Sequence, residues 1–278
     1  MSTQMSRQNE TDTQNLIFHR TNAHKGRHLA VTPQNSPMKH LSYGRIILDG
    51  ETPRASFETG ELEVGLICLS GKGTVAVGGD SYELGRYDAI YLPRDSSVKI
   101  TTDSQVDFAE CSAAVEGDYP VQVVRYAEVE KEGSLKFVAG GVSNARAVSV
   151  LIGKNVKAGR ILAGVTTSEP GNWTSWPPHE HAEMLEELYV YYDMPAPAFG
   201  VQLVYTNPDQ PDFAGIVRDG DAVLMPQGFH PNVSVPGYPI SYVWMMAAHR
   251  EVEDRRYGVV TVQPGFDKGS GGPGASRK

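Results

Sequence analysis

The chain has 278 residues, a formal net charge of −8 and two cysteines. Charged residues make up 21% and hydrophobic residues 40% of the sequence, which is ordinary for a soluble protein of one large or two average domains. The acidic balance argues against nucleic acid or an anionic membrane as the main partner. Two cysteines cannot build a disulfide framework, and no signal core or membrane-spanning run is present, so a cytoplasmic protein is predicted.

Both ends of the chain have the composition of disordered segments. Residues 1–15 are polar and lack a regular apolar pattern, and residues 266–278 are rich in glycine and serine. Such sequences bury too little apolar surface to offset the entropy lost on ordering. We therefore predict that 1–15 and 266–278 are disordered.

Between these ends, short apolar runs alternate with turn residues, as expected for an all-β sandwich or barrel. The first series of runs comprises Leu41–Leu48, Glu63–Leu69, Thr74–Val77, Ala89–Leu92, Ser97–Thr101 and Val106–Ser112. The second comprises Ala147–Ile152, Ile161–Thr166, Leu188–Tyr192, Gly200–Tyr205, Ala222–Met225, Asn232–Val235 and Tyr242–Ala247. Few segments have a sustained helical period, so the fold class predicted is all-β.

The two series share an internal repeat. The sequence DAIYLP at Asp88–Pro93 matches DAVLMP at Asp221–Pro226, and each copy follows shortly after a glycine. Upstream, Glu63–Ile67 roughly matches Glu187–Tyr191. Matches at corresponding points of both halves favour duplication of one β-barrel. The predicted units are a barrel over 16–125, a connecting segment over 126–144 and a second barrel over 145–265.

The stretch from Trp176 to Tyr192, WPPHEHAEMLEELYVYY, carries the main functional signal. Residues i and i+2 of a strand point to the same face, so His179 and His181 can direct both imidazoles at one point. A carboxylate on the next strand and His230, in the loop PQGFHP, would complete a four-ligand metal site. The spacing differs from the helical His-Glu-x-x-His motif of zinc proteases.

The first barrel lacks this combination. No His-x-His precedes Glu63, and Ser97 stands opposite His230 when the two halves are aligned. A hydroxyl is a poor substitute for several imidazoles, so we predict that the barrel over 16–125 binds no metal and is structural.

The second barrel resembles the cupins. His-x-His, a following glutamate, and the later element GDAVLMPQGFHP at Gly220–Pro231 have the order and spacing of the cupin motifs. Gly200–Thr206, Cys111-Ser-Ala and Glu58-Thr-Gly extend the similarity to the 5-deoxyglucuronate isomerase family of inositol catabolism, related to 4-deoxy-5-keto-uronate isomerase. A shorter stretch after His181 and a different strand end at Trp244–His249 depart from that family's pattern.

This resemblance implies two tandem cupin (jelly-roll) barrels, a bicupin. It also implies an aldose–ketose isomerase that converts 5-deoxy-glucuronate to 5-dehydro-2-deoxy-gluconate in myo-inositol catabolism, using one divalent metal ion. The ligands carried over are His179, His181, Glu187 and His230, with Zn²⁺ as the first choice and Mn²⁺ or Fe²⁺ as alternatives. The spacing from His181 favours Glu186 instead, whereas strand register favours Glu187, which we choose.

The reaction also needs a proton-transfer group and contacts to a sugar acid. Glu186, Tyr205 and His249 are the catalytic candidates, and Tyr189 is a further candidate base. Gln202, Tyr189 and Arg218 are predicted to bind substrate, with Arg250 as another cation for the substrate carboxylate. A homo-oligomer is expected, because the edges of β-sheets commonly pair.

Three other functions remain open at this point. The protein could act as a 4-deoxy-5-keto-uronate isomerase of pectin breakdown, as a cupin oxygenase, or as a sugar-acid-binding cupin without turnover. Metal-dependent isomerisation, oxygen consumption and binding alone would distinguish these activities.

Overall fold

The computed structural model describes residues 15–266 and is almost entirely β-structure. Its one α-helix is the single turn α1 (Tyr126–Val129), and no helix in the described part is long and apolar enough to cross a membrane. The all-β prediction is confirmed. The predicted disordered ends lie outside the described residues, except for Asn15 and Phe266.

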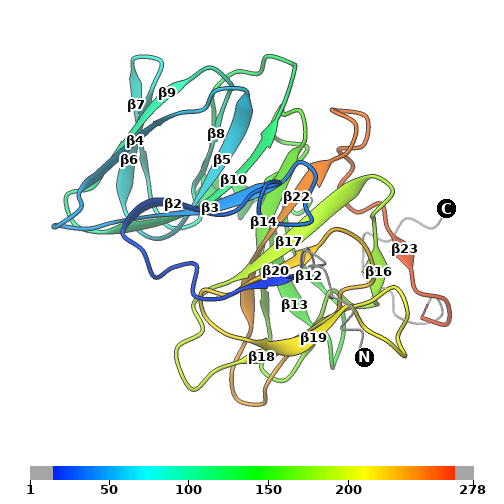
Figure 1. The fold of residues 1–278 in the computed structure, drawn as a ribbon. Helices are drawn as coiled ribbons and strands as arrows, with labels where there is room; N and C mark the ends of the chain where they lie inside the picture. The colour runs from blue at the N-terminus through cyan, green and yellow to red at the C-terminus, as the bar shows by residue number, and fades with distance from the viewer. Residues whose placement is uncertain (1–14, 267–278) are drawn as a thin grey trace, which may run out of the picture.

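The N-terminal half consists of two sheets, at the upper left of Figure 1. A six-stranded sheet has the order β11-β8-β5-β10-β3-β2, and a four-stranded sheet has the order β4-β9-β6-β7. The strands are β2 (Gly26–Val31), β3 (Ser42–Leu48), β4 (Arg54–Glu58), β5 (Leu62–Gly71), β6 (Gly73–Val77), β7 (Asp80–Leu84), β8 (Ala89–Leu92), β9 (Ser97–Thr101), β10 (Val106–Ala114) and β11 (Gln122–Val124).

The C-terminal half repeats this arrangement at the lower right of Figure 1. A seven-stranded sheet has the order β1-β20-β17-β22-β14-β13-β12, a four-stranded sheet has the order β15-β21-β18-β19, and β16 pairs with β23. The strands are β1 (Ile17–Phe18), β12 (Lys136–Ala139), β13 (Arg146–Ile152), β14 (Ile161–Ser168), β15 (Trp173–Thr174), β16 (His179–Glu180), β17 (Leu185–Tyr191), β18 (Gly200–Val204), β19 (Phe213–Val217), β20 (Ala222–Met225), β21 (Asn232–Ser234), β22 (Ser241–Ala248) and β23 (Thr261–Val262).

The large sheets and the four-stranded sheets of the two halves correspond strand for strand, whereas β12 and the pair β16–β23 occur only in the C-terminal half. The repeat found in the sequence forms β8 and β20, which pair with β5 and β17 respectively. Val64 pairs with Leu92 in the first half, and Glu187 pairs with Met225 at the same point of the second. The predicted match of Glu63 with Glu187 is therefore wrong by one residue, because Glu63 is equivalent to Glu186.

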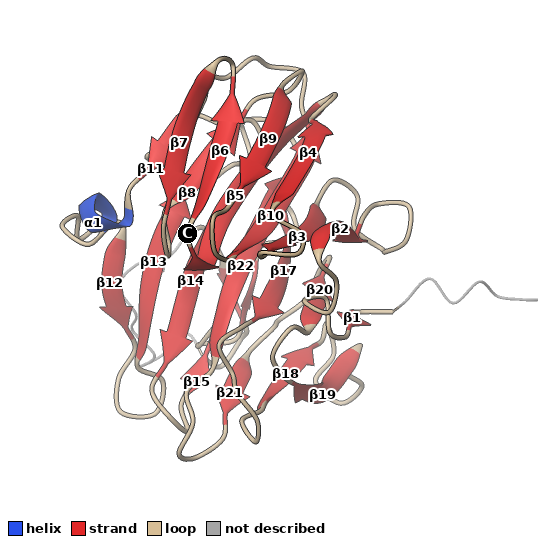
Figure 2. Ribbon diagram, turned by 90° about the vertical axis from the view of Figure 1, so that its left-hand side faces the viewer, coloured by secondary structure: helices blue, strands red, loops and turns tan. Residues whose placement is uncertain are grey.

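The first strand of the chain crosses into the other half. β1 pairs with β20 of the C-terminal sheet, and β11 has the equivalent edge position beside β8 in the N-terminal sheet. Figure 2 shows β1 beside β20. The units 16–125 and 145–265 remain a prediction, with the qualification that β1 belongs to the C-terminal sheet.

A reciprocal pair of buried glutamates joins the halves. Glu186 of β17 accepts hydrogen bonds of 2.6–2.7 Å from the backbone N–H groups of residues 39–41. Its equivalent Glu63 accepts bonds of 2.6–2.8 Å from the N–H groups of residues 159–161. Ionised carboxylates form the stronger class of hydrogen bonds, and each clamp satisfies three backbone donors of the opposite half.

Apolar side chains fill the interior of the N-terminal barrel. Val64, the equivalent of Glu187, packs there with Leu66, Val75 and Phe108, all of which are buried. Cys68 lies in the same core as a free thiol. That this half binds no metal and is structural stays a prediction.

Candidate metal centre

Three side chains converge inside the C-terminal barrel. One ligand atom from each of His181, Glu187 and His230 lies within 4.8 Å of the others, and all three residues are buried. The Oε2 atom of Glu187 is 2.8 Å from Nε2 of His181 and 3.1 Å from Nε2 of His230. The structure therefore brings together three of the four residues predicted to bind metal.

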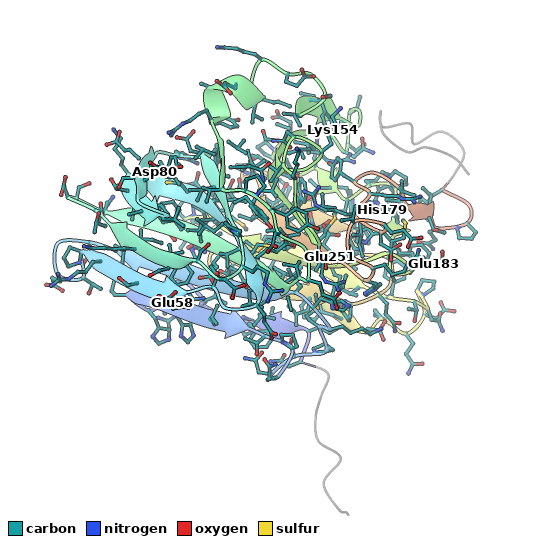
Figure 3. All side chains as sticks on the ribbon, turned by 90° about the horizontal axis from the view of Figure 1, so that it is seen from above. Glu58, Asp80, Lys154, His179, Glu183 and Glu251 are labelled. Atoms are coloured by element: carbon teal, nitrogen blue, oxygen red, sulfur yellow. The ribbon has the colours of Figure 1, made fainter. Side chains whose placement is uncertain are left out.

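His179 stands beside this cluster. Its ring centroid is 5.0 Å from that of His230 and 6.3 Å from that of His181. Figure 3 shows His179 in the C-terminal half, away from Glu58 and Asp80 of the N-terminal half. His179 therefore adjoins the three clustered side chains without belonging to the group whose ligand atoms lie within 4.8 Å of one another.

Local backbone geometry positions these side chains. In β17, alternation turns Glu187 toward the cluster and Glu186 toward residues 39–41 of the other half. His230 is presented by a turn at Gly228, which has φ of 92°. A β-carbon at Gly228 would lie 2.8 Å from the carbonyl oxygen of Tyr205, so only glycine allows this close approach.

The three histidines share one hydrogen-bonding pattern. Their Nδ1 atoms face the carbonyl oxygens of Pro177, Leu185 and Gly228, at 2.8, 3.2 and 2.9 Å respectively. Because a carbonyl only accepts, each Nδ1 carries the proton and each Nε2 is left for another bond. Within residues 15–266, Nε2 of His230 is buried and forms no hydrogen bond, although Oε2 of Glu187 lies 3.1 Å away. Metal-binding histidines are held in this way, so the residues fit a divalent ion.

The charges of the cluster also suit a cation. Burial opposes ionisation of Glu187, but the charge and hydrogen bond of His181 outweigh it and lower the pKa of Glu187 to about 2. Burial, aided by the neighbouring His230, lowers the pKa of His179 to about 3. At neutral pH the site thus offers an ionised carboxylate and a neutral imidazole, the forms that bind metals.

A cavity of about 590 Å³, including its part open to solvent, adjoins the cluster. Its floor is the inner face of the seven-stranded sheet, where cross-strand partners share one side. Tyr257 of the C-terminal segment covers it and stacks on Trp244 with ring centroids 5.0 Å apart. Besides His179, His181 and Glu187, the lining comprises Arg146, Val148, Thr166, Ser175, Leu185, Tyr189, Tyr242, Trp244, Met246 and residues 257–260.

Two of the predicted substrate-binding residues lie at this site in different ways. Tyr189 lines the cavity, with its hydroxyl 2.5 Å from Oγ of Ser175. Gln202 is fully buried and donates from Nε2 to the carbonyl oxygens of His230 and Pro231, at 2.9 and 3.3 Å. Gln202 therefore supports the loop that carries His230, and the structure does not place it in the cavity lining.

The other predicted residues lie away from the cavity. The hydroxyl of Tyr205 donates to Oε1 of Gln263 at 2.7 Å, and Nε2 of His249 is 3.1 Å from the carbonyl oxygen of Ala182. Arg218 is exposed, and Glu186 is occupied by three backbone amides of the other half. The catalytic roles of Glu186, Tyr205 and His249 and the substrate role of Arg218 do not agree with these positions.

Sequence analysis missed Arg146, Tyr242, Trp244 and Tyr257, which all line the cavity. The alternation of Tyr242, Trp244 and Met246 along β22 is a signal that could have identified one face of that strand. Arg146 begins β13, and Tyr257 lies in the loop between β22 and β23. Both reach the cavity only because segments distant in sequence come together in the fold.

Comparisons with known proteins agree with this architecture. The model of the KduI/IolB family matches residues 16–260. The 5-deoxy-glucuronate isomerase of Geobacillus kaustophilus is 30% identical over 241 residues, covering 80% of this chain and 85% of that protein. That of Bacillus subtilis strain 168 is 27% identical, covering 78% and 84% respectively.

Solved structures support the fold. An IolB-like protein from Salmonella typhimurium LT2 superposes with a TM-score of 0.81 at 24% identity, covering 91% of this chain and 98% of that one. Oxalate decarboxylase from Bacillus subtilis superposes with a TM-score of 0.63 at 14% identity, covering 90% and 79%. The predicted bicupin architecture is confirmed by these likenesses and the duplicated sheets. The chain belongs to the KduI/IolB family.

Proposed function

We propose that this protein is an isomerase that interconverts 5-deoxy-glucuronate and 5-dehydro-2-deoxy-gluconate in myo-inositol catabolism, with one bound divalent ion. Its family and the activity named for its relatives support the reaction. The structural observation that carries the proposal is the set of histidines whose Nδ1 atoms face carbonyl oxygens beside the ionised Glu187.

His179, His181, Glu187 and His230 would hold the ion. Three imidazoles and one carboxylate suit Zn²⁺, which is our first choice, and they also suit Mn²⁺ or Fe²⁺. When bound, a divalent ion stabilises the negative charge that develops on neighbouring sugar oxygens as a proton moves between two carbons.

The protein's own side chains orient the substrate and exclude water. Tyr189, Tyr242, Trp244 and Tyr257 form aromatic walls around the cavity, which suit an extended carbon chain. Burial, with a further contribution from the Glu187 charge, raises the pKa of Tyr257. Its phenol therefore stays protonated at neutral pH and is a hydrogen-bond donor for a sugar oxygen.

The direct test is to incubate the purified, metal-loaded protein with 5-deoxy-glucuronate and to follow the ketone product by NMR. Parallel reactions should use 4-deoxy-5-keto-uronate and record oxygen uptake. We expect conversion of 5-deoxy-glucuronate without oxygen consumption. Preference for the second substrate, oxygen uptake, or binding without conversion would each contradict the proposed reaction.

We also propose that the protein works in the cytoplasm as a homo-oligomer. Cys68 and Cys111 are both buried free thiols, which suits a reducing compartment. β12 forms an outer edge of the seven-stranded sheet and exposes Val138, so it offers unpaired backbone groups to another copy.

Replacing Ser97 by alanine should leave turnover unchanged within about twofold. The sequence alignment sets Ser97 opposite His230, but Ser97 is exposed at the start of β9 and the interior of its barrel is apolar. The strand pairings make the buried Val98 the equivalent of His230 instead. The measurement is kcat/KM with 5-deoxy-glucuronate, compared with the unmodified protein. A hundredfold loss, on the order of that caused by removing a catalytic group, would place chemistry in the N-terminal half.

A further inference from the structure

Arg146 is the one lysine or arginine among the described residues that line the cavity. It begins β13, where it pairs with Ser168 of β14. Two residues further along, Val148 pairs with Thr166, which in turn pairs with Tyr242 of β22. Because paired residues and alternate residues share a face, Arg146 projects from the same inner face of the sheet as these cavity residues.

Two backbone carbonyl oxygens hold the guanidinium of Arg146, but within the described residues no carboxylate is paired with its charge. Nη1 donates to the carbonyl oxygen of Asn144 at 3.0 Å, and Nη2 donates to that of Trp176 at 2.8 Å. The residue is half-buried, and within the described chain it forms no ion pair. An arginine has five N–H donors in a planar fork, so three remain after these two bonds.

The cluster of His181, Glu187 and His230 lies at one end of the cavity, and Arg146 lies at the other. Glu187 lies on β17 and Arg146 on β13, with β22 and β14 between them. The two residues are also offset along the strands, because Glu187 is level with Met246 and Leu162 whereas Arg146 is level with Ser168. Both charged ends act on the phenols of Tyr242 and Tyr257. Burial is the main cause that raises the pKa values of these phenols; the charge of Glu187 raises them further, and the charge of Arg146 lowers them.

We infer that Arg146 binds the carboxylate of a sugar acid whose carbonyl end lies at the cluster of His181, Glu187 and His230. This inference rests on the proposed function and specifies how that site selects its substrate. A guanidinium fork matches the two oxygens of a carboxylate and binds them more strongly than it binds a neutral hydroxyl. The residue thus selects sugar acids over neutral sugars and fixes which end of the chain meets the metal.

The arginines predicted from sequence do not compete for this role. Arg218 is exposed and lies outside the cavity lining. Arg250 is already paired with Glu253 and Asp254, both at 2.7 Å. Neither arginine therefore offers a guanidinium inside the cavity that is free to bind a substrate carboxylate.

The test is binding of D-glucuronate, with D-glucose as the neutral counterpart, to metal-loaded protein by calorimetry. Arg146→Gln removes the charge while its amide can still donate to carbonyl oxygens. We expect affinity for glucuronate to fall about 10- to 100-fold, the range for a lost charged hydrogen bond, and affinity for glucose to stay within about twofold. Arg146→Lys keeps the charge without the fork and should give an intermediate loss.

Two controls separate selectivity from structural damage. Arg54→Gln removes an exposed arginine of the N-terminal half and should change neither affinity. Metal content per chain should be the same in all variants, because Arg146 also supports the carbonyl of Trp176, near His179. If Arg146→Gln loses metal, Arg146→Lys provides the comparison, and an unchanged glucuronate preference in that variant would overturn the inference.

The outcome is independent of the proposed reaction. If the protein isomerises 5-deoxy-glucuronate but Arg146→Gln keeps its preference for glucuronate over glucose, the inference about Arg146 is wrong and the function stands. If the protein shows no isomerisation but the variant loses that preference, Arg146 binds the carboxylate and the proposed function is wrong.

Discussion

Substituting Glu187 by glutamine should release the divalent ion and lower turnover at least a hundredfold. Glu187 is the only carboxylate among the described cavity-lining residues, and its Oε2 lies between the Nε2 atoms of His181 and His230. A neutral amide retains the shape but loses the anionic donor that a divalent cation prefers. Elemental analysis of the purified variant, together with kcat on 5-deoxy-glucuronate, measures both effects.

Glu186→Gln is the matched control, since it makes the same chemical change one residue away on the opposite face of β17. This variant should retain one ion per chain. If Glu186→Gln loses the metal while Glu187→Gln retains it, the strand register is wrong and Glu186 is the ligand.

Glu186→Gln should instead destabilise the fold, by about 2–4 kcal/mol in the free energy of unfolding. Its carboxylate accepts three backbone N–H groups from residues 39–41, and a glutamine offers one neutral oxygen in place of two charged ones. Of the donors left behind, the N–H of Leu41 is buried and those of Lys39 and His40 are partly buried, so water replaces the lost bonds only in part. Urea unfolding followed by tryptophan fluorescence measures the change.

Glu63→Gln should have a similar effect, because Glu63 holds residues 159–161 in the equivalent way. Glu183→Gln is the neutral comparison, since Glu183 is exposed and such changes rarely exceed about 0.5 kcal/mol. Equal stability of all three variants would show that the clamps between the halves contribute nothing to folding.

The local features of the site were predictable from sequence. Alternation along a strand is a short-range property, so the His-x-His pair and the strand after Leu185 determine which side chains turn inward. A run of turn-separated apolar segments likewise indicated an all-β fold, and the repeated DAIYLP and DAVLMP segments indicated a duplication. These features depend on neighbours within a few residues.

Features that depend on distant contacts were not predictable. Glu186 and Glu187 have the same chemistry, and only the amides of residues 39–41 distinguish the clamp from the ligand. The crossing of β1 into the C-terminal sheet involves a strand of two residues, too short to carry a pattern. Arg146 belongs to the site only because β13, β14 and β22 pair in a particular register.

Reconstitution of the metal-free protein tests the central claim most directly. The protein, stripped with a chelator, should be inactive on 5-deoxy-glucuronate, and stepwise addition of Zn²⁺, Mn²⁺ or Fe²⁺ should restore isomerisation in proportion up to one ion per chain. His230→Ala, treated identically, should bind the ion weakly and stay inactive. Full isomerase activity in the metal-free protein, or activity that rises independently of the occupancy of this site, would contradict the account.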